Sequence, residues 1–447
     1  MSPSPSSRGS GGRQPFELSG SESLAAVATG ERTVSEIVGG LVERVRQVDG
    51  EIGAFRICDA DAVLRLAKDL DDTVAGPLWG LAVGVKDVID TADLPTGYGS
   101  PLFADHRPAE DARAVATLRR AGAIVLGKTE STEFAMYQPT RTRNPVDPAR
   151  TPGGSSSGSA AAVAAGMVPV ALGTQTAGSV VRPAAYCGVY GYKPAWGWSS
   201  TDGIWRLSER LDTLGMFART VADLELLHRA LVHESHGGPS RPTSQRRPTS
   251  LPRRAAVLSA GSWGDVDHDV LEALDRVAGR LEDAGWRVSE LVMPHTWHRL
   301  PEHHQTVMAV EVAKNLHAVL GPRVELISDG ARRIVEHGDA LPAREYLGAL
   351  EATEEARNHL VPLAEATDVV LAPSALGVAP LGLDATGDPV MCRAWTLLGV
   401  PAANVPFHRR GDGLPVGVQA IAPHYDDPAF LGDLSSLETA LSQEESP

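Results

Sequence analysis

Two stretches rich in glycine and hydroxyl side chains decide the fold: residues 151–166 are TPGGSSSGSAAAVAAG, and residues 173–183 are GTQTAGSVVRP. Glycine lets backbone amides approach a ligand closely, and serine can supply a nucleophile or pass on a proton. Glycine and serine runs are most often flexible linkers. Here, however, residues 160–166 are rich in helix-forming alanine, and residues 168–172 form an apolar, strand-like run. The pattern therefore predicts a catalytic surface and not a linker.

A third element lies upstream, where residues 80–88 are GLAVGVKDV. This apolar run ends in Lys86 and is typical of a buried strand that delivers an amine to a site. A lysine by itself is more often a solvated strand end, so the interpretation depends on the neighbouring motifs. Lysine serves as a base only when its amine is neutral near pH 7, and burial lowers its pKa from about 10.4. The apolar residues 81–85 are consistent with such burial.

With these elements in this order, the chain resembles the amidase signature family, serine hydrolases that cleave carboxamides with a Ser, cis-Ser, Lys triad. The similarity continues along most of the chain and is weakest from about residue 234 to residue 367. The further matching segments are residues 127–134, 144–145, 184–194, 211–223, 399–402, 405–406 and 413–419. The resemblance implies an α/β protein of the amidase signature fold, with a mixed central β-sheet covered by α-helices on both faces.

The resemblance also implies roles for individual residues. Ser179 would be the nucleophile, Ser155 the proton shuttle and Lys86 the base, with a cis peptide bond between Gly154 and Ser155. An amide is a poor electrophile, so the reaction also needs donors for the oxyanion. These donors would be the backbone amides of Thr176, Ala177, Gly178 and Ser179. Hydroxyls of Ser156, Ser157 and Ser159 are expected to serve the loop and to cap the following helix.

Small departures from the family pattern favour a stand-alone amidase. Gln175 stands where many members carry aspartate, and Arg182 lies one place later than in the transamidating members. Ala177, which replaces a glycine common in the family, is a mild departure that does not bear on this choice. The alternative is the glutamine-hydrolysing subunit of a transamidation complex. Transfer of the acyl group to an amine acceptor also stays open, because an acyl-enzyme does not dictate its acceptor. A scaffold protein without activity is a further alternative, although all three catalytic positions are occupied.

The substrate is less well defined by the sequence. Met136, Trp205 and Arg210 are candidate substrate-binding residues, and Arg210 stands where the family usually has a small residue. Trp205 could equally belong to the core. We expect Arg182 to pair with an internal acid such as Asp212 and not with a substrate carboxylate. No metal is expected, because Pro294 and Pro301 break the helical spacing of the histidines at positions 295, 298, 303 and 304.

The net charge and the cysteine content limit the classes of molecule that the protein is expected to bind. The formal charge of −15 makes nucleic acid and anionic membrane poor partners, because phosphate binding needs a positive surface. A small-molecule amide fits better, without a cofactor, and a homodimer is compatible with the sequence. The 3 cysteines are far apart and odd in number, which favours a cytoplasmic protein with free thiols. Neither a membrane span nor a secretory signal is expected.

Helix and strand patterns alternate along the chain. We expect a disordered tail over residues 1–15 and a single amidase domain over residues 16–447. This domain would contain a mobile linker near 233–254 and a variable, substrate-shaping region near 255–367. Helices are predicted at 21–48, 113–121, 269–284, 307–319 and 343–364, and strands at 123–126, 255–258 and 286–292.

Overall fold

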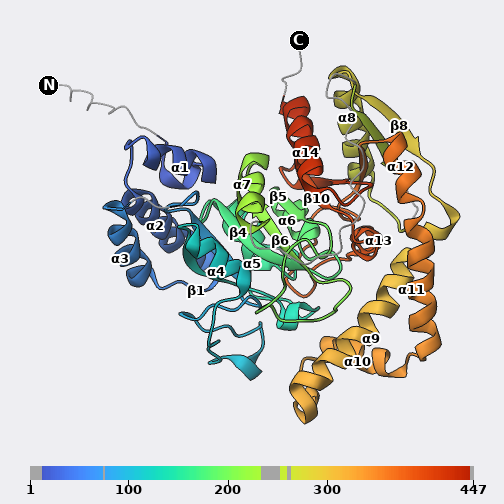
Figure 1. The fold of residues 1–447 in the computed structure, drawn as a ribbon, viewed down its shortest axis with the longest axis horizontal. Helices are drawn as coiled ribbons and strands as arrows, with labels where there is room; N and C mark the ends of the chain where they lie inside the picture. Colours follow the sequence, from blue (N-terminus) through green and yellow to red (C-terminus); the bar gives the residue numbers. More distant parts are fainter. Residues whose placement is uncertain (1–12, 74–75, 233–251, 259–262, 443–447) are drawn as a thin grey trace.

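One mixed β-sheet of eleven strands runs through the part of the chain that the computed structural model describes, namely residues 13–73, 76–232, 252–258 and 263–442 (Figure 1). The strands are β1 (Phe55–Ile57), β2 (Ala82–Lys86), β3 (Ile124–Thr129), β4 (Val170–Gln175), β5 (Tyr190–Lys193), β6 (Thr213–Ala218), β7 (Arg254–Leu258), β8 (Arg287–Leu291), β9 (Val369–Pro373), β10 (Ala402–Arg409) and β11 (Pro415–Ile421). Their order across the sheet is β1-β3-β2-β4-β6-β5-β10-β11-β9-β7-β8.

The sheet contains two parallel groups joined by antiparallel strands. In the first group β2 lies between β3 and β4, and in the second β7 lies between β8 and β9. The strands from β4 through β6, β5, β10 and β11 to β9 pair in antiparallel fashion.

The α-helices of the described residues are α1 (Gly20–Ala28), α2 (Val34–Ile52), α3 (Ala60–Asp71), α4 (Arg113–Arg120), α5 (Ser157–Ala164), α6 (Val181–Cys187), α7 (Val221–Val232), α8 (His268–Asp283), α9 (Leu300–Leu320), α10 (Asp329–Ala340), α11 (Ala343–Arg357), α12 (Leu360–Ala366), α13 (Val390–Leu398) and α14 (Asp427–Ser442).

Both faces of the sheet are buried. Successive residues of a strand point to opposite faces. Ala82 and Ala171 pack into one apolar cluster with residues of α2, α3 and α5, whereas Val83 and Leu172 pack into another with residues of α4, α7 and α14. Full burial of a valine or leucine side chain stabilises a fold by about 1.5–3 kcal/mol. The predicted α/β fold, with helices on both faces of a mixed sheet, is confirmed.

Two of the predicted helices are each divided in two. The pattern at 21–48 belongs to α1 and α2, because Gly30 has a positive φ of 71° and Thr33 caps α2 by accepting a hydrogen bond from the amide of Glu36. The pattern at 343–364 belongs to α11 and α12, which are separated at residues 358–359. The predicted helices at 113–121 and 269–284 and the strands that follow them are present, within a few residues, as α4, α8, β3 and β8.

Parts of the predicted tail and linker fall outside the described residues, namely 1–12 and 233–251. Pro15, which we expected in the tail, is buried and begins a short 3₁₀ helix, Pro15–Glu17, that packs on α2. Arg254, the last residue of the predicted linker, begins β7. The helices α9 to α12, which belong to the weakly matching region, lie along one flank of the molecule (Figure 1, orange). Within the described ranges, we find no helix with the length and apolar character needed to cross a bilayer.

Candidate active site

The three residues predicted to react come from three segments near one edge of the sheet. Lys86 is the last residue of β2, and Ser179 lies in the loop between β4 and α6. Because β2 and β4 are parallel neighbours, their carboxyl ends lie at the same edge. Ser155 lies in the turn before α5, and the peptide bond that precedes it, from Gly154, is cis. The fold therefore brings Lys86 and Ser155 into contact and places the loop of Ser179 at the same edge of the sheet.

Lys86 is fully buried, and its Nζ lies 2.8 Å from Ser155 Oγ and 2.8 Å from Thr174 Oγ1. Burial lowers the pKa of Lys86 well below its ordinary value, and the negative charge of Asp212 opposes this shift. A low pKa favours the neutral amine, which can accept a proton. The Ser179 hydroxyl has no hydrogen-bond partner among the described residues, and its side chain lines a cavity. The hydrogen-bonded chain thus extends from Lys86 to Ser155, and Ser179 faces the cavity.

The loop that presents Ser179 offers unpaired backbone donors. The amides of Ala177, Gly178 and Ser179 form no hydrogen bond within the described part of the chain. Buried amides without an acceptor are rare in folded proteins, so an oxygen of a bound molecule is a natural partner for them. Among the described residues other than glycine, Tyr98, Phe134 and Ala135 have a positive φ. Ala177 does not, so replacing the glycine common at this position causes no backbone strain.

Side chains on either side of the loop hold its shape. Gln175 Oε1 accepts hydrogen bonds from the amides of Val180 (2.9 Å) and Val181 (3.1 Å), and its Nε2 donates to Thr396 Oγ1 (3.0 Å). The Thr396 hydroxyl, in α13, donates in turn to the Ala177 carbonyl at 2.7 Å. Gln175 therefore fixes the start of α6 with one end of its amide and contacts α13 with the other.

Thr176 is held from two sides. The carbonyl of Thr176 lies 2.8 Å from Nε2 of His304, a fully buried residue of α9, so this nitrogen carries the proton. Burial lowers the pKa of His304 to about 3, and its Nδ1 has no partner among the described residues. The Thr176 hydroxyl donates to Asp212 Oδ1 at 2.6 Å. Sequence reasoning missed the contact between His304 and Thr176, because α9 lies in the region where the similarity to the family is weakest.

Asp212 accepts hydrogen bonds from the loop that presents Ser179 and from two backbone amides, and it does not pair with Arg182. Its Oδ2 accepts from the amides of Leu207 (2.8 Å) and Ser208 (3.0 Å), and burial raises its pKa to about 6. The expected pair of Arg182 with Asp212 is therefore wrong, because the carboxylate is already satisfied by Thr176 and two backbone amides. Arg182 Nη2 instead donates to the Gly154 carbonyl at 2.6 Å and to Thr386 Oγ1 at 3.3 Å.

A narrow cavity of about 30 Å³ lies beside Ser179 and the loop. Its wall includes Met136, one of the predicted substrate-binding residues, together with Arg182 and apolar side chains of α9 and α10. A more open cavity of about 450 Å³ shares Tyr137, Met308 and Ile334 with the first, so the two adjoin. We call these two adjoining cavities, one beside Ser179 and one beside α10, the path.

The other two predicted substrate-binding residues lie outside this wall. Trp205 stacks on Phe134 with ring centroids 4.7 Å apart and belongs to an aromatic cluster with Tyr98 and Phe103. Arg210 is half exposed, and its Nε lies 3.5 Å from Glu311 Oε1. Aromatic packing and a carboxylate partner thus draw these two side chains away from the cavity.

The serines beside Ser155 were expected to cap α5, and the structure assigns them other contacts. Ser157 donates to the Gly153 carbonyl (2.7 Å) and Ser159 to the Leu172 carbonyl (2.8 Å). Ser156 occupies the N-cap position without a capping hydrogen bond and contacts the backbone of Thr174. These hydroxyls are buried against the turn and β4, so the backbone there supplies their partners.

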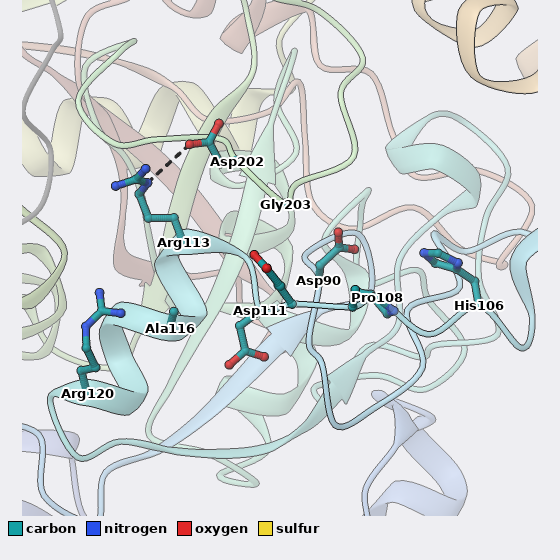
Figure 2. A pocket seen from close by; sticks show the side chains of 11 residues that line it. Asp90, His106, Pro108, Asp111, Arg113, Ala116, Arg120, Asp202 and Gly203 are labelled. Atoms are coloured by element: carbon teal, nitrogen blue, oxygen red, sulfur yellow. Dashed lines mark hydrogen bonds and ion pairs between the residues drawn. The ribbon is translucent and has the colours of Figure 1, made fainter.

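A larger cavity of about 710 Å³ lies elsewhere on the molecule (Figure 2). Its wall carries charges of both signs, including Asp111, Arg120 and the ion pair of Arg113 with Asp202, whose nearest atoms are 3.4 Å apart. Neither Lys86 nor Ser155 nor Ser179 lines it. The unpaired loop amides lie beside the small cavity and not beside this larger one.

Comparisons with known proteins identify the family of the chain. The family model described as Amidase matches residues 36–431. The A subunit of the glutamyl-tRNA(Gln) amidotransferase of Salinispora arenicola is 32% identical, over 95% of this chain and 97% of that protein. Among solved structures, one described as an amidase has a TM-score of 0.82 at 29% identity and covers 94% of this chain and 99% of its own. The peptide amidase PAM has a TM-score of 0.81 at 26% identity, with coverage of 95% and 97%.

Proposed function

The chain belongs to the amidase signature family, and we propose that it is an amidohydrolase that cleaves a small-molecule carboxamide to an acid and ammonia or an amine. The observation that carries this proposal is the buried Lys86 amine 2.8 Å from Ser155, beside a cavity that Ser179 lines. A buried amine of lowered pKa next to a hydroxyl relay is an arrangement that activates a serine nucleophile.

In the first half-reaction Ser179 Oγ attacks the amide carbon. Its proton passes to Ser155 Oγ as the Ser155 proton passes to the neutral amine of Lys86. The carbonyl oxygen becomes an oxyanion against the backbone amides of Thr176, Ala177, Gly178 and Ser179. Loss of one such donor typically costs about 10²–10³ in rate.

The tetrahedral intermediate then breaks its carbon–nitrogen bond. Lys86, now an ammonium, returns its proton through Ser155 to the leaving nitrogen, which departs as ammonia or an amine. In the second half-reaction water takes the place of the amine and gives its proton to the same relay. The attack of water on the acyl carbon releases the acid and restores the Ser179 hydroxyl. Acyl transfer to an amine acceptor follows the same steps with the acceptor in place of water.

A second candidate function is the glutaminase component of a transamidation complex. The observation that favours it is the 32% identity to the A subunit of glutamyl-tRNA(Gln) amidotransferase over nearly the whole of both chains. Against it, Gln175 stands in place of the more common aspartate and holds α6 by its neutral amide. Turnover of simple amides by the chain alone supports the stand-alone amidase, whereas glutamine hydrolysis that requires added partner proteins supports the glutaminase.

The test is labelling of the purified chain with a serine-directed fluorophosphonate, followed by peptide mapping. We expect a single adduct on Ser179, its loss in Ser179→Ala and strong slowing in Lys86→Met. Lys68→Met, on the exposed side of α3, is the matched control and is expected to label as the wild type does. An adduct on another serine, or equal labelling of Lys86→Met and wild type, would contradict the proposed roles.

A further inference from the structure

Arg182 is a buried cation that forms no ion pair with any residue the structure describes. Its side chain is only 3% exposed, and Nη2 donates to the Gly154 carbonyl and Thr386 Oγ1. Its Nε and Nη1 have no hydrogen-bond partner among the described residues. A guanidinium remains charged in proteins and carries five N–H donors. Buried donors of a charged group are expensive to leave unpaired, so this arrangement calls for an acceptor that the folded chain does not itself supply.

The position of Arg182 connects it to the reacting serine. Both residues line the same small cavity. The Arg182 amide donates to the Gly178 carbonyl at 3.0 Å, so Arg182 lies one helical turn beyond the loop that presents Ser179. Side chains separated by three or four residues in a helix have Cβ atoms about 5–6 Å apart. A group bound by Arg182 would therefore lie a few bonds from a carbonyl attacked by Ser179.

The charged side chains that line the path, Arg182 and Arg333, are cationic. Among the described residues, no aspartate or glutamate lines the small cavity or the one that adjoins it. The outer cavity carries one cation, Arg333 of α10, among its described lining residues. The charge of Asp388 raises the pKa of Arg182, but Asp388 itself forms an ion pair with Arg393, whose nearest nitrogen lies 3.5 Å from it. In a chain of net charge −15, a path without acids is a local exception that favours an anionic ligand.

We propose that Arg182 binds the carboxylate of the substrate, so that the preferred substrates are small amides that also carry an anionic group. This inference rests on the proposed function, because it places the scissile carbonyl at Ser179. The apolar wall, which includes Met136, Leu207 and Met308, would contact the short carbon spacer between the two groups. Charge-assisted hydrogen bonds in such an apolar setting are strong and give specificity.

The first experiment compares succinamate with butanamide, which replaces the carboxylate by a methyl group. We expect wild-type kcat/KM to be larger for succinamate. Arg182→Met should lower it by at least about 30-fold for succinamate and much less for butanamide, and Arg182→Lys should restore part of the preference. Arg332→Met is the matched control, because Arg332 pairs with Asp329 on α10 and lines neither cavity. It should leave both rates unchanged.

Equal losses for both substrates in Arg182→Met would overturn the proposal, since a residue that only holds the Gly154 turn affects all amides alike. A wild-type preference for butanamide would overturn it without any variant. Fluorophosphonate labelling of Ser179 in Arg182→Met shows whether the reacting residues remain in place.

A second experiment separates this inference from the proposed function. Succinate is expected to raise the melting temperature of the wild type and not that of Arg182→Met. If succinate acts in this way while no amide is hydrolysed, the carboxylate site stands and the hydrolase proposal fails. If neutral amides are hydrolysed and succinate has no effect on the wild type, the hydrolase stands and the carboxylate site is wrong.

Discussion

The hydroxyl of Thr176 donates a 2.6 Å hydrogen bond to the carboxylate of Asp212, and this carboxylate also raises the pKa of Lys86 by its charge. One residue outside the predicted triad therefore acts on two parts of the site. It holds the loop that would bind the oxyanion, and it partly offsets the effect of burial on the base. The two effects can be separated, because only one of them needs the negative charge.

Removal of the Asp212 charge is expected to change the pH profile. Asp212→Asn removes the charge that raises the pKa of Lys86, so this pKa falls further. The amine then stays neutral to lower pH, and the acid limb of kcat/KM should move to lower pH. Thr176→Val removes the hydrogen bond that lowers the pKa of Asp212, so this carboxyl loses its charge over part of the pH range. The variant should lower kcat by about 10-fold or more and move the acid limb in the same direction as Asp212→Asn does, but less far. If the acid limb of kcat/KM lies at the same pH in the wild type and in both variants, the charge of Asp212 does not raise the pKa of Lys86.

Loss of the proposed shuttle should cost more than loss of a neighbouring hydroxyl. Ser155→Ala removes the group that contacts Lys86 at 2.8 Å, and we expect kcat to fall by about 10²–10⁴-fold, which is the usual value of positioned proton transfer. Ser159→Ala is the matched control, since this buried hydroxyl donates to the Leu172 carbonyl. It should reduce stability and change kcat little. Equal losses of kcat in the two variants would remove Ser155 from the relay.

His304 is expected to make the fold sensitive to acid. Burial lowers its pKa to about 3, while a histidine in the unfolded chain titrates near 6.5. Between these values the unfolded state binds a proton that the folded state does not, so stability falls as pH falls below about 6.5. From pH 7 to pH 5 this group should cost the wild type about 2 kcal/mol of the free energy of unfolding.

The measurement is urea unfolding at pH 7 and pH 5. His304→Gln keeps a donor for the Thr176 carbonyl and does not titrate, so it should lose less stability than the wild type between these two pH values. His298→Gln, at an exposed position, should behave as the wild type does. The same loss in His304→Gln and in the wild type would show that His304 is not the group responsible.

Arg210, which the sequence suggests as a substrate-binding residue, is expected to have little effect on specificity. It is 54% exposed and pairs with Glu311 away from the cavity wall. Arg210→Ser should leave the ratio of kcat/KM for succinamate and butanamide unchanged and cost less than about 1 kcal/mol in stability. A change in this ratio would return Arg210 to the substrate path.

Local patterns predicted much of the fold. The apolar run before Lys86, the alanine-rich segment after Ser155 and the helix and strand units around α4 and α8 are present as expected. The boundary between α1 and α2 was missed, because the cap at Thr33 interrupts a periodicity that continues on both sides of it. Met136 lies at the cavity, whereas Trp205 packs against Phe134 instead.

The sequence by itself determined which residues come to the edge of the sheet, since strand and helix periodicity depend on neighbours two to four positions apart. It also placed Lys86, Ser155 and Ser179 in an order that a known family shares. Only the tertiary structure decided what surrounds them. His304 contacts Thr176 from a helix far along the chain, and Asp212 accepts from Thr176, so that Arg182 pairs with no acid among the described residues. Such contacts depend on how distant elements pack, and no local pattern encodes that packing.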